Sequence, residues 1–310
     1  MALRSSTDRV GLVAVESVYG VAETITAANA MLLMNAQVTP AADKLERNTD
    51  KPYFGADPFV LVGKKVTLTA DIDILGAAAA SVGDAAPLGP LYRVCGHAED
   101  LVASTSATYS PVSTNFESGT VSFYWAGILF QMLGTRGSMD FNFSIKNYAK
   151  ASISLTGLLV APADGEPPGS IDWSVFQTPP AIETETWTVT VGGTNVCAQE
   201  LSLAANATIN IIECSEAREV AYTDRKPTGT LKVYKDATLA TWNPWDVAEA
   251  QSVVVLQNTI TKSAGLNCSM PIRAQLEYPK PVDMDGVAGF EIPFNCIPDT
   301  GGDEYSFTLT

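Results

Sequence analysis

Hydrophobic and polar residues alternate along much of this chain with the period of two that is typical of a half-buried β-strand. The clearest run covers residues 138–146, where Met139, Phe141, Phe143 and Ile145 alternate with small polar residues. Other runs rich in β-branched and aromatic residues predict strands at residues 65–75, 119–130, 151–160, 185–191 and 208–212. The pattern therefore predicts a mainly β protein.

Turn-forming residues separate several of these runs. Residues 134–137 (Gly-Thr-Arg-Gly) predict a hairpin turn between the strands at 119–130 and 138–146. Near the C-terminus, Asp285 and Gly286 precede a strand at 287–296, and residues 298–302 (Pro-Asp-Thr-Gly-Gly) precede a last strand. Strands joined by short turns of this kind form antiparallel sheets.

Two segments carry helical rather than strand signals. Residues 84–99 have a helical stripe at i, i+3, i+4 and i+7, formed by Leu88, Leu91, Tyr92 and Cys95. We expect Asp84 to cap this helix and Gly96 to end it. A second, shorter helix is predicted at residues 243–250, with Pro244 in its first turn.

A chain of 310 residues favours two domains over a single core. Residues 162–180 contain five prolines and predict an irregular linker between an N-terminal domain (residues 1–161) and a C-terminal domain (residues 181–310). Each domain is predicted to be a β-sandwich or barrel-like unit with one α-helix on its flank.

The two domains share a weak internal similarity that indicates a possible duplication. In each, an Arg, a Lys-Pro pair and a Gly precede a strand, followed by a candidate helix and closing hairpins. The matching residues are Arg47, Lys51, Pro52 and Gly55 in the first domain, and Arg225, Lys226, Pro227 and Gly229 in the second.

Composition narrows the classes of function. The 19 basic and 34 acidic residues give a net charge of −15, which disfavours nucleic-acid binding. The five cysteines are scattered with no Cys-x-x-Cys pair, so neither a zinc site nor a disulfide framework is expected. We expect no signal peptide and no membrane span, because the apolar runs are too short.

Residues that could support catalysis are scarce. His97 is the only histidine, it lacks a Gly-x-Ser-x-Gly motif, and we interpret it as capping a helix carbonyl. Residues 283–286 (Asp-Met-Asp-Gly) lack the ligand spacing of a calcium loop and predict a turn. We therefore expect neither an enzyme nor a cofactor or metal site.

Several short pieces, in order, resemble the tail tube proteins (major tail proteins) of tailed bacteriophages of the siphophage type. The opening is similar at residues 16–20 (Glu-Ser-Val-Tyr-Gly) and 27–33 (Ala-Ala-Asn-Ala-Met-Leu-Leu), and a strand-to-helix step is similar at residues 61–69 and 86–96. The closing strands at residues 282–309 complete the resemblance.

This resemblance implies a structural virion protein, made and assembled in the host cytoplasm, whose β-sandwich domains form stacked rings around a hollow tail tube. DNA would pass through the lumen without specific binding, and partners would include tape measure, tail terminator and baseplate or tip proteins. A duplicated chain would form a ring of three with pseudo-sixfold symmetry, although six chains stay possible. Inner strands of neighbouring copies would join edge to edge.

Two groups of residues are candidates for roles in such a tube. We interpret residues 38–57 as a long irregular loop that reaches the next ring, with a charged cluster formed by Asp43, Lys44, Glu46, Arg47, Asp50 and Lys51. Asp71 and Asp73 share a solvated strand face and are candidates for the lumen. A solvated surface loop and ordinary strand alternation are the simpler interpretations.

Two other functions stay open at this point. One is a related tube or tail component, such as a tail terminator or the inner tube of a contractile system. The other is an exported β-sandwich adhesin or carbohydrate-binding module, which predicts paired cysteines and an exposed aromatic platform.

Overall fold

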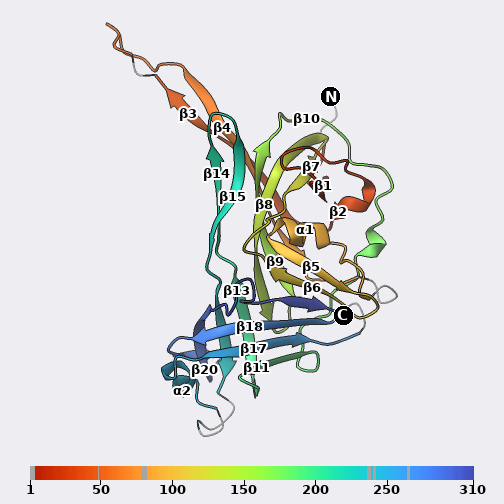
Figure 1. Ribbon diagram of the computed structural model, residues 1–310, viewed down its shortest axis with the longest axis vertical. Helices are drawn as coiled ribbons and strands as arrows, with labels where there is room; N and C mark the ends of the chain where they lie inside the picture. Colours follow the sequence, from red (N-terminus) through yellow and green to blue (C-terminus); the bar gives the residue numbers. More distant parts are fainter. Residues whose placement is uncertain (1–3, 48, 78–81, 236–238, 240–241, 264–265) are drawn as a thin grey trace.

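The computed structural model describes residues 4–47, 49–77, 82–235, 239, 242–263 and 266–310. These residues form mostly antiparallel strands with two short α-helices, which confirms the mainly β prediction. In the described part of the chain no helix has both the length and the apolar character needed to cross a membrane. Figure 1 shows the N-terminal half above the C-terminal half, with a hairpin projecting from the top.

The N-terminal half contains a curved sheet and a second layer packed on it. Its sheet has the order β3–β4–β9–β8, and β8 also pairs with β7, which pairs with β1. The elements are β1 (Arg9–Val15), η1 (Ala27–Asn29), β2 (Ala30–Met31), β3 (Met34–Glu46), β4 (Phe59–Asp73), α1 (Gly89–Val94), β5 (His97–Val102), β6 (Ser106–Pro111), β7 (Gly119–Trp125), β8 (Ile128–Ser144) and β9 (Lys150–Leu159).

The C-terminal half has a sheet of the order β13–β16–β20–β19, and β20 also pairs with β18. Its elements, after the short β10 (Ala163–Asp164) and η3 (Trp173–Val175), are β11 (Trp187–Val191), β12 (Thr194–Val196), β13 (Ala198–Ala204), β14 (Ala207–Glu213), β15 (Arg218–Arg225), β16 (Thr228–Tyr234), α2 (Pro244–Glu249), β17 (Val253–Ile260), β18 (Cys268–Leu276), β19 (Lys280–Met284), β20 (Val287–Cys296) and β21 (Phe307–Leu309).

The two halves are joined by strand pairing as well as by the linker. The second part of β8 pairs antiparallel with β13, so that Phe141 faces Leu203 and Phe143 faces Leu201. The last strand, β21, pairs with β6 of the first half and with β18 of the second. Buried side chains from both halves form one connected hydrophobic cluster. The division into domains at residues 162–180 stays a prediction.

The first helix is shorter than the sequence pattern indicates. It begins at Gly89 rather than at Asp84, and ends at Val94, with Gly96 in the left-handed region as expected. Pro90 lies in the first turn, where a residue without an N–H group is tolerated. His97 therefore lies in β5 and not in the helix. The second helix begins where expected, and the Asn243 side chain caps it by accepting from the Trp245 N–H.

One prediction about a turn was wrong, and one about a loop was correct only in part. Residues 134–137 lie inside β8, at a register shift against β9, and the turn between β7 and β8 is formed by Ala126 and Gly127, both with positive φ. The irregular loop predicted at residues 38–57 is confirmed only in part, because residues 38–46 belong to β3 and pair with β4, whereas residues 47 and 49–57 lie outside any strand or helix. By contrast, the Asp285–Gly286 turn is confirmed, and the Asp283 side chain accepts from the Gly286 N–H.

Candidate assembly surfaces: a two-faced sheet, its edges and two hairpin arms

The eight strands β3–β4–β9–β8–β13–β16–β20–β19 form one continuous sheet across both halves. Along β4, Val66, Leu68, Ala70 and Ile72 are buried, and the residues between them are partly or fully exposed. The same alternation continues in β9, β8, β13, β16 and β20. One face is therefore core, and the other presents mostly polar side chains.

Asp71 and Asp73 both lie on the polar face, as the strand alternation predicts. Asp71 accepts hydrogen bonds from the Ser152 hydroxyl (2.7 Å) and the Asn35 amide (3.1 Å). The bond from Ser152 is the main reason that the pKa of Asp71 lies below its usual value. Asp73 lies opposite Lys150 in the strand register, and burial raises its pKa.

Both ends of the eight-stranded sheet are open. Among the residues that the structure describes, β3 pairs only with β4, and β19 pairs only with β20. Unpaired backbone N–H and C=O groups at such an edge form a template for another strand. The sheet can therefore be extended at both ends by another chain.

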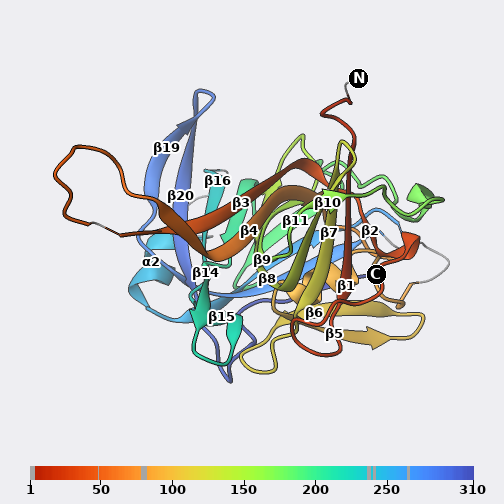
Figure 2. The same cartoon turned by 90° about the horizontal axis from the view of Figure 1, so that it is seen from above.

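The distal parts of β3 and β4 leave the body as a hairpin that we call the first arm (residues 42–63). Figures 1 and 2 both show its tip projecting away from the rest of the molecule. Its apolar side chains are solvent-exposed, and Val60 keeps 62% of its surface. The other exposed apolar residues of this arm are Leu45, Tyr53, Phe54, Phe59, Leu61 and Val62.

The charged candidates of the sequence prediction lie along this arm and at its tip. Lys51 forms an ion pair with Asp57 inside the tip, and this contact is the main cause of the low pKa of Asp57. The Lys44 ammonium lies 4.9 Å from the centre of the Phe59 ring. Asp43, Glu46, Arg47 and Asp50 are exposed. The structure thus brings two of the predicted residues into contacts within the arm.

A second hairpin, formed by β14 and β15, leaves the sheet of the C-terminal half between β13 and β16. We call residues 206–227 the second arm. It runs back along the N-terminal half in Figure 1 and points the same way as the first arm. In contrast to the first arm, it is docked: Val220 is completely buried. Arg218 donates to the Lys64 carbonyl (2.5 Å), which links the tip of the second arm to the root of the first.

Tyr222 is the main apolar anchor of the second arm. Its ring stacks on Phe116 at 4.5 Å between centres. Its hydroxyl donates to the Gly137 carbonyl and lies 3.3 Å from the Val94 carbonyl at the end of α1. Gly96 adjoins it, and a Cβ there would lie 3.0 Å from the Tyr222 hydroxyl. The arm therefore occupies the place where the end of α1 meets β8.

Arg136 and Tyr19 hold the same arm by its backbone. Arg136 donates to the Val220 carbonyl (2.6 Å) and to the Glu219 carboxylate (2.7 Å), and Tyr19 accepts from the Val220 N–H (2.6 Å). Tyr19 is positioned by the buried Glu16, which accepts from the Ser118 and Thr120 hydroxyls and from the Gly20 and Gly134 N–H groups. A carboxylate with this many donors fixes the loop that carries Tyr19.

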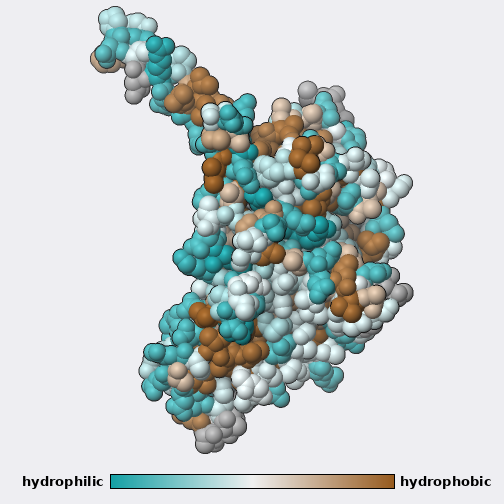
Figure 3. All heavy atoms as spheres, in the orientation of Figure 1, coloured by the Kyte–Doolittle hydropathy of each residue, from teal (hydrophilic) through white to brown (hydrophobic). Residues whose placement is uncertain are grey.

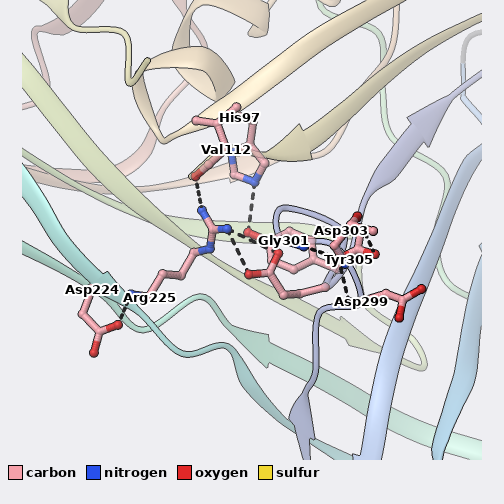
Figure 4. Close-up of polar contacts among 10 residues, drawn as sticks. His97, Val112, Asp224, Arg225, Asp299, Gly301, Asp303 and Tyr305 are labelled. Atoms are coloured by element: carbon pink, nitrogen blue, oxygen red, sulfur yellow. Dashed lines mark hydrogen bonds and ion pairs between the residues drawn. The ribbon is translucent and has the colours of Figure 1, made fainter. Parts of the chain in front are cut away.

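Arg225 at the root of the second arm forms a buried ion pair close to His97 of β5, the only histidine of the chain (Figure 4). Arg225 bonds to Glu304 (3.0 Å) and donates to the Val112 carbonyl (2.7 Å). His97 Nδ1 lies 3.2 Å from the Tyr92 carbonyl, which can only accept, so that Nδ1 carries the proton and Nε2 accepts from the Tyr305 hydroxyl (3.0 Å). Burial lowers the pKa of His97 to about 4, so the ring is neutral.

This arrangement agrees with the interpretation of His97 as a residue that bonds a helix carbonyl. The imidazole is buried, and both of its nitrogens are occupied by these structural bonds. The side chains gathered here hold the C-terminal segment, the second arm and the end of α1 together.

Sequence reasoning did not identify the second arm or its anchors. It predicted a strand at residues 208–212, which lies in β14, but not its partner β15. The residues matched in the proposed internal similarity also lie at different places, since Arg47 is at the first arm's tip and Arg225 is at the second arm's root. The signal that could have been used is the polar turn at residues 214–217 between two β-prone runs.

A comparison with known families gives one match over most of the chain. The family model described as phage tail tube protein matches residues 6–296. No curated protein matches the chain.

Proposed function

The chain belongs to the phage tail tube protein family, and from this premise we propose that copies of it self-assemble into stacked rings that form the hollow tube of a phage tail. Its role in the virion tail is structural. DNA passes through the tube during delivery to the host cell.

The observation that carries this proposal is the continuous eight-stranded sheet with two open edges and one polar face. Pairing of β19 in one copy with β3 in the next would extend the sheet around a ring, with the core face outward and the polar face inward. This head-to-tail contact closes into a ring without leaving an exposed strand edge. The intramolecular pairing of β8 with β13 supports the geometry, since it already joins two four-stranded sheets in this way.

The width of the resulting barrel favours three chains per ring. Three chains contribute twenty-four strands (three times eight). At a spacing of about 4.8 Å and a tilt of about 40°, these strands close a barrel about 50 Å across at the backbone. Six chains would give about 100 Å by the same estimate, far wider than a DNA duplex requires. The repeated order of hairpin arm, helix and strands in the two halves supports the pseudo-sixfold symmetry of such a ring.

The polar face has the character expected of a lumen through which DNA slides. Asp71 and Asp73 would face the lumen, where carboxylates repel phosphate groups. The basic residues Lys150 and Lys232 lie beside the carboxylates of Asp73 and Glu200 rather than forming a basic patch. The net charge of −15 agrees with passage of DNA without specific binding.

Ring stacking would use the tip of the first arm, which projects beyond the body in the direction of both arms. Asp43, Lys44, Glu46, Arg47, Asp50 and Lys51 would set the register between rings through complementary charges. The ends of the tube would bind the tail terminator and the baseplate or tip proteins, and the lumen would enclose the tape measure protein during assembly in the host cytoplasm.

Electron microscopy of the purified, concentrated protein tests this proposal. We expect hollow tubes or stacked rings whose end views average with threefold symmetry and a weaker sixfold modulation. A β3 variant, Val38→Pro, should remain folded and monomeric, because the Val38 N–H faces away from β4 and its removal disfavours strand addition at the open edge. Monomers of the unmodified chain at all concentrations would contradict the proposal.

A further inference from the structure

The two arms lie at equivalent places in the two halves. The first arm extends β3 and β4 and precedes α1, and the second arm extends β13 and β16 and precedes α2. Both α-helices are followed by a residue with positive φ, Gly96 after α1 and Gln251 after α2, and a strand begins one or two residues later. The surroundings of the two helix ends can therefore be compared position by position.

In the N-terminal half, the second arm covers the end of α1, the start of β5 and the residue after β6. Tyr222 lies against Gly96 and near the Val94 carbonyl, and Arg225 donates to the Val112 carbonyl. In the C-terminal half the corresponding positions are the end of α2, the start of β17 and the residues after β18. These are Glu249, Gln251, Val253 and Tyr278, which we call the receiving surface.

The receiving surface is uncovered. Tyr278 keeps 60% of its surface and Val253 keeps 39%, and Glu249 and Gln251 are also exposed. The Tyr278 hydroxyl donates to Glu249 (2.9 Å), and the Gln275 amide donates to the Gln251 carbonyl (3.1 Å). The end of α2 and the chain after β18 therefore adjoin, as the end of α1 and Val112 do in the other half. Figure 3 shows hydrophobic residues gathered on this lower part of the molecule and along the projecting arm.

We propose that the first arm of one copy docks on the receiving surface of a neighbouring copy, as the second arm docks on the N-terminal half of its own chain. The inference rests on the proposed assembly, and it adds a second contact between neighbouring copies of the same ring. If β19 of one copy pairs with β3 of the next, as β8 pairs with β13, the first arm of the second copy is brought to the C-terminal half of the first. The apolar residues Phe59 and Leu61, which share one face of β4, then lose their exposure against Val253 and Tyr278.

The occupant is a second copy of this chain because the complementary element exists in every copy. The first arm has exposed apolar side chains on both faces of β4, so burial of one face leaves the other for a further contact. The second arm shows what a docked hairpin looks like here: one face is mostly half-buried, with Val220 completely buried, and the other is mostly exposed.

Site-specific photocrosslinking in assembled particles tests this contact. p-Benzoylphenylalanine replaces Phe59, the assembled fraction is irradiated, and crosslinked peptides are identified by mass spectrometry. We expect crosslinks between copies to residues 249–255 and 276–279. Crosslinks between copies that map instead to the N-terminal half, or none between copies in particles that are tubes by electron microscopy, would overturn this inference and leave the proposed function standing. Absence of any assembled particles would contradict both.

A matched pair of variants gives an independent readout. Tyr278→Asp should lower the yield of tubes about tenfold or more, because a charge replaces an apolar contact at the interface. Leu101→Asp, an exposed apolar position in β5 outside the receiving surface, should leave the yield unchanged. Circular dichroism confirms that both variants fold. Equal yields from the two folded variants would overturn the inference.

Discussion

The two arms are the same kind of element in two different situations. Each is a hairpin that continues two strands of the main sheet beyond the body, and each carries apolar residues on its strands. The second arm packs the buried Val220 and the half-buried Tyr222 against the N-terminal half of its own chain, whereas the first arm leaves Phe59 and Val60 in solvent. The N-terminal half is therefore covered by an arm of its own chain, whereas none of the described residues covers the corresponding surface of the C-terminal half.

An exposed apolar hairpin is costly for a protein that remains monomeric, because it promotes association. The second arm shows that this sequence can bury such a hairpin when a suitable surface is present. We infer that the first arm is retained because another copy supplies that surface. The comparison predicts opposite consequences for equivalent substitutions in the two arms.

The largest difference is expected for the aromatic residues. Tyr222→Ala should lower the free energy of unfolding of the monomer by about 4 kcal/mol, because it leaves a cavity and removes the stacking on Phe116. Phe59→Ala should change it by less than about 0.5 kcal/mol, because Phe59 is exposed. Chemical denaturation measures both, and equal effects would remove the distinction between the arms.

The ion pairs provide a second test. Glu304→Gln should cost about 3 kcal/mol, because it leaves the buried Arg225 guanidinium without its counter-charge. Asp57→Asn in the first arm should leave the monomer's global stability nearly unchanged, since Asp57 bonds only to Lys51 and Thr49 within the projecting tip and not to the body. A stability loss confined to Asp57→Asn would contradict the view that the second arm, and not the first, is part of the fold.

A pH titration tests the burial of His97, which lies beside the root of the second arm. Because burial lowers the pKa of His97 to about 4, the unfolded chain binds a proton at this residue between pH 6.5 and 4 that the folded chain does not. The contribution of neutral His97 is therefore present above pH 6.5 and is lost as pH falls, by about 3 kcal/mol in full. Measured as the stability difference between the unmodified chain and His97→Asn, it should shrink over this range. A difference that is constant with pH would contradict the burial.

The smallest expected effect on the monomer is that of Val60→Ser. The substitution exchanges one exposed side chain for another, so the midpoint of thermal unfolding should not change measurably. The yield of tubes should fall, since Val60 is apolar surface that the proposed assembly would bury. Pelleting by ultracentrifugation measures the yield, and an unchanged yield would argue against burial of this face.

Short sequence patterns correctly predicted those elements whose conformation depends on only a few adjacent residues. The alternation in residues 138–146 and the Asp285–Gly286 turn were confirmed because strand period and positive φ are properties of a few adjacent residues. The first helix was overestimated because Leu88 lies at the spacing of a helical stripe although it precedes the helix as its cap. Residues 134–137 contain two glycines that serve a register shift rather than a turn.

The docking of the second arm could not be predicted in this way. Tyr222 contacts Gly137, Val94 and Phe116, which are far away in sequence, and nothing near Tyr222 distinguishes it from an exposed strand residue. The same holds for Arg136 and Arg225, whose partners lie in other strands and loops. For the first arm, the charged residues could be identified from the sequence. Its extended hairpin could not, because it depends on pairing between β3 and β4.

Hydrogen exchange measured on the monomer and on assembled tubes tests the contrast between the arms most directly. We predict that backbone amides at Leu45 and at Val60 and Val62 exchange rapidly in the monomer and become strongly protected in tubes. Amides at Val220 and Tyr222 should be protected in both states. A first arm that is already protected in the monomer, or that stays unprotected in tubes, would contradict the conclusion that another copy supplies its partner.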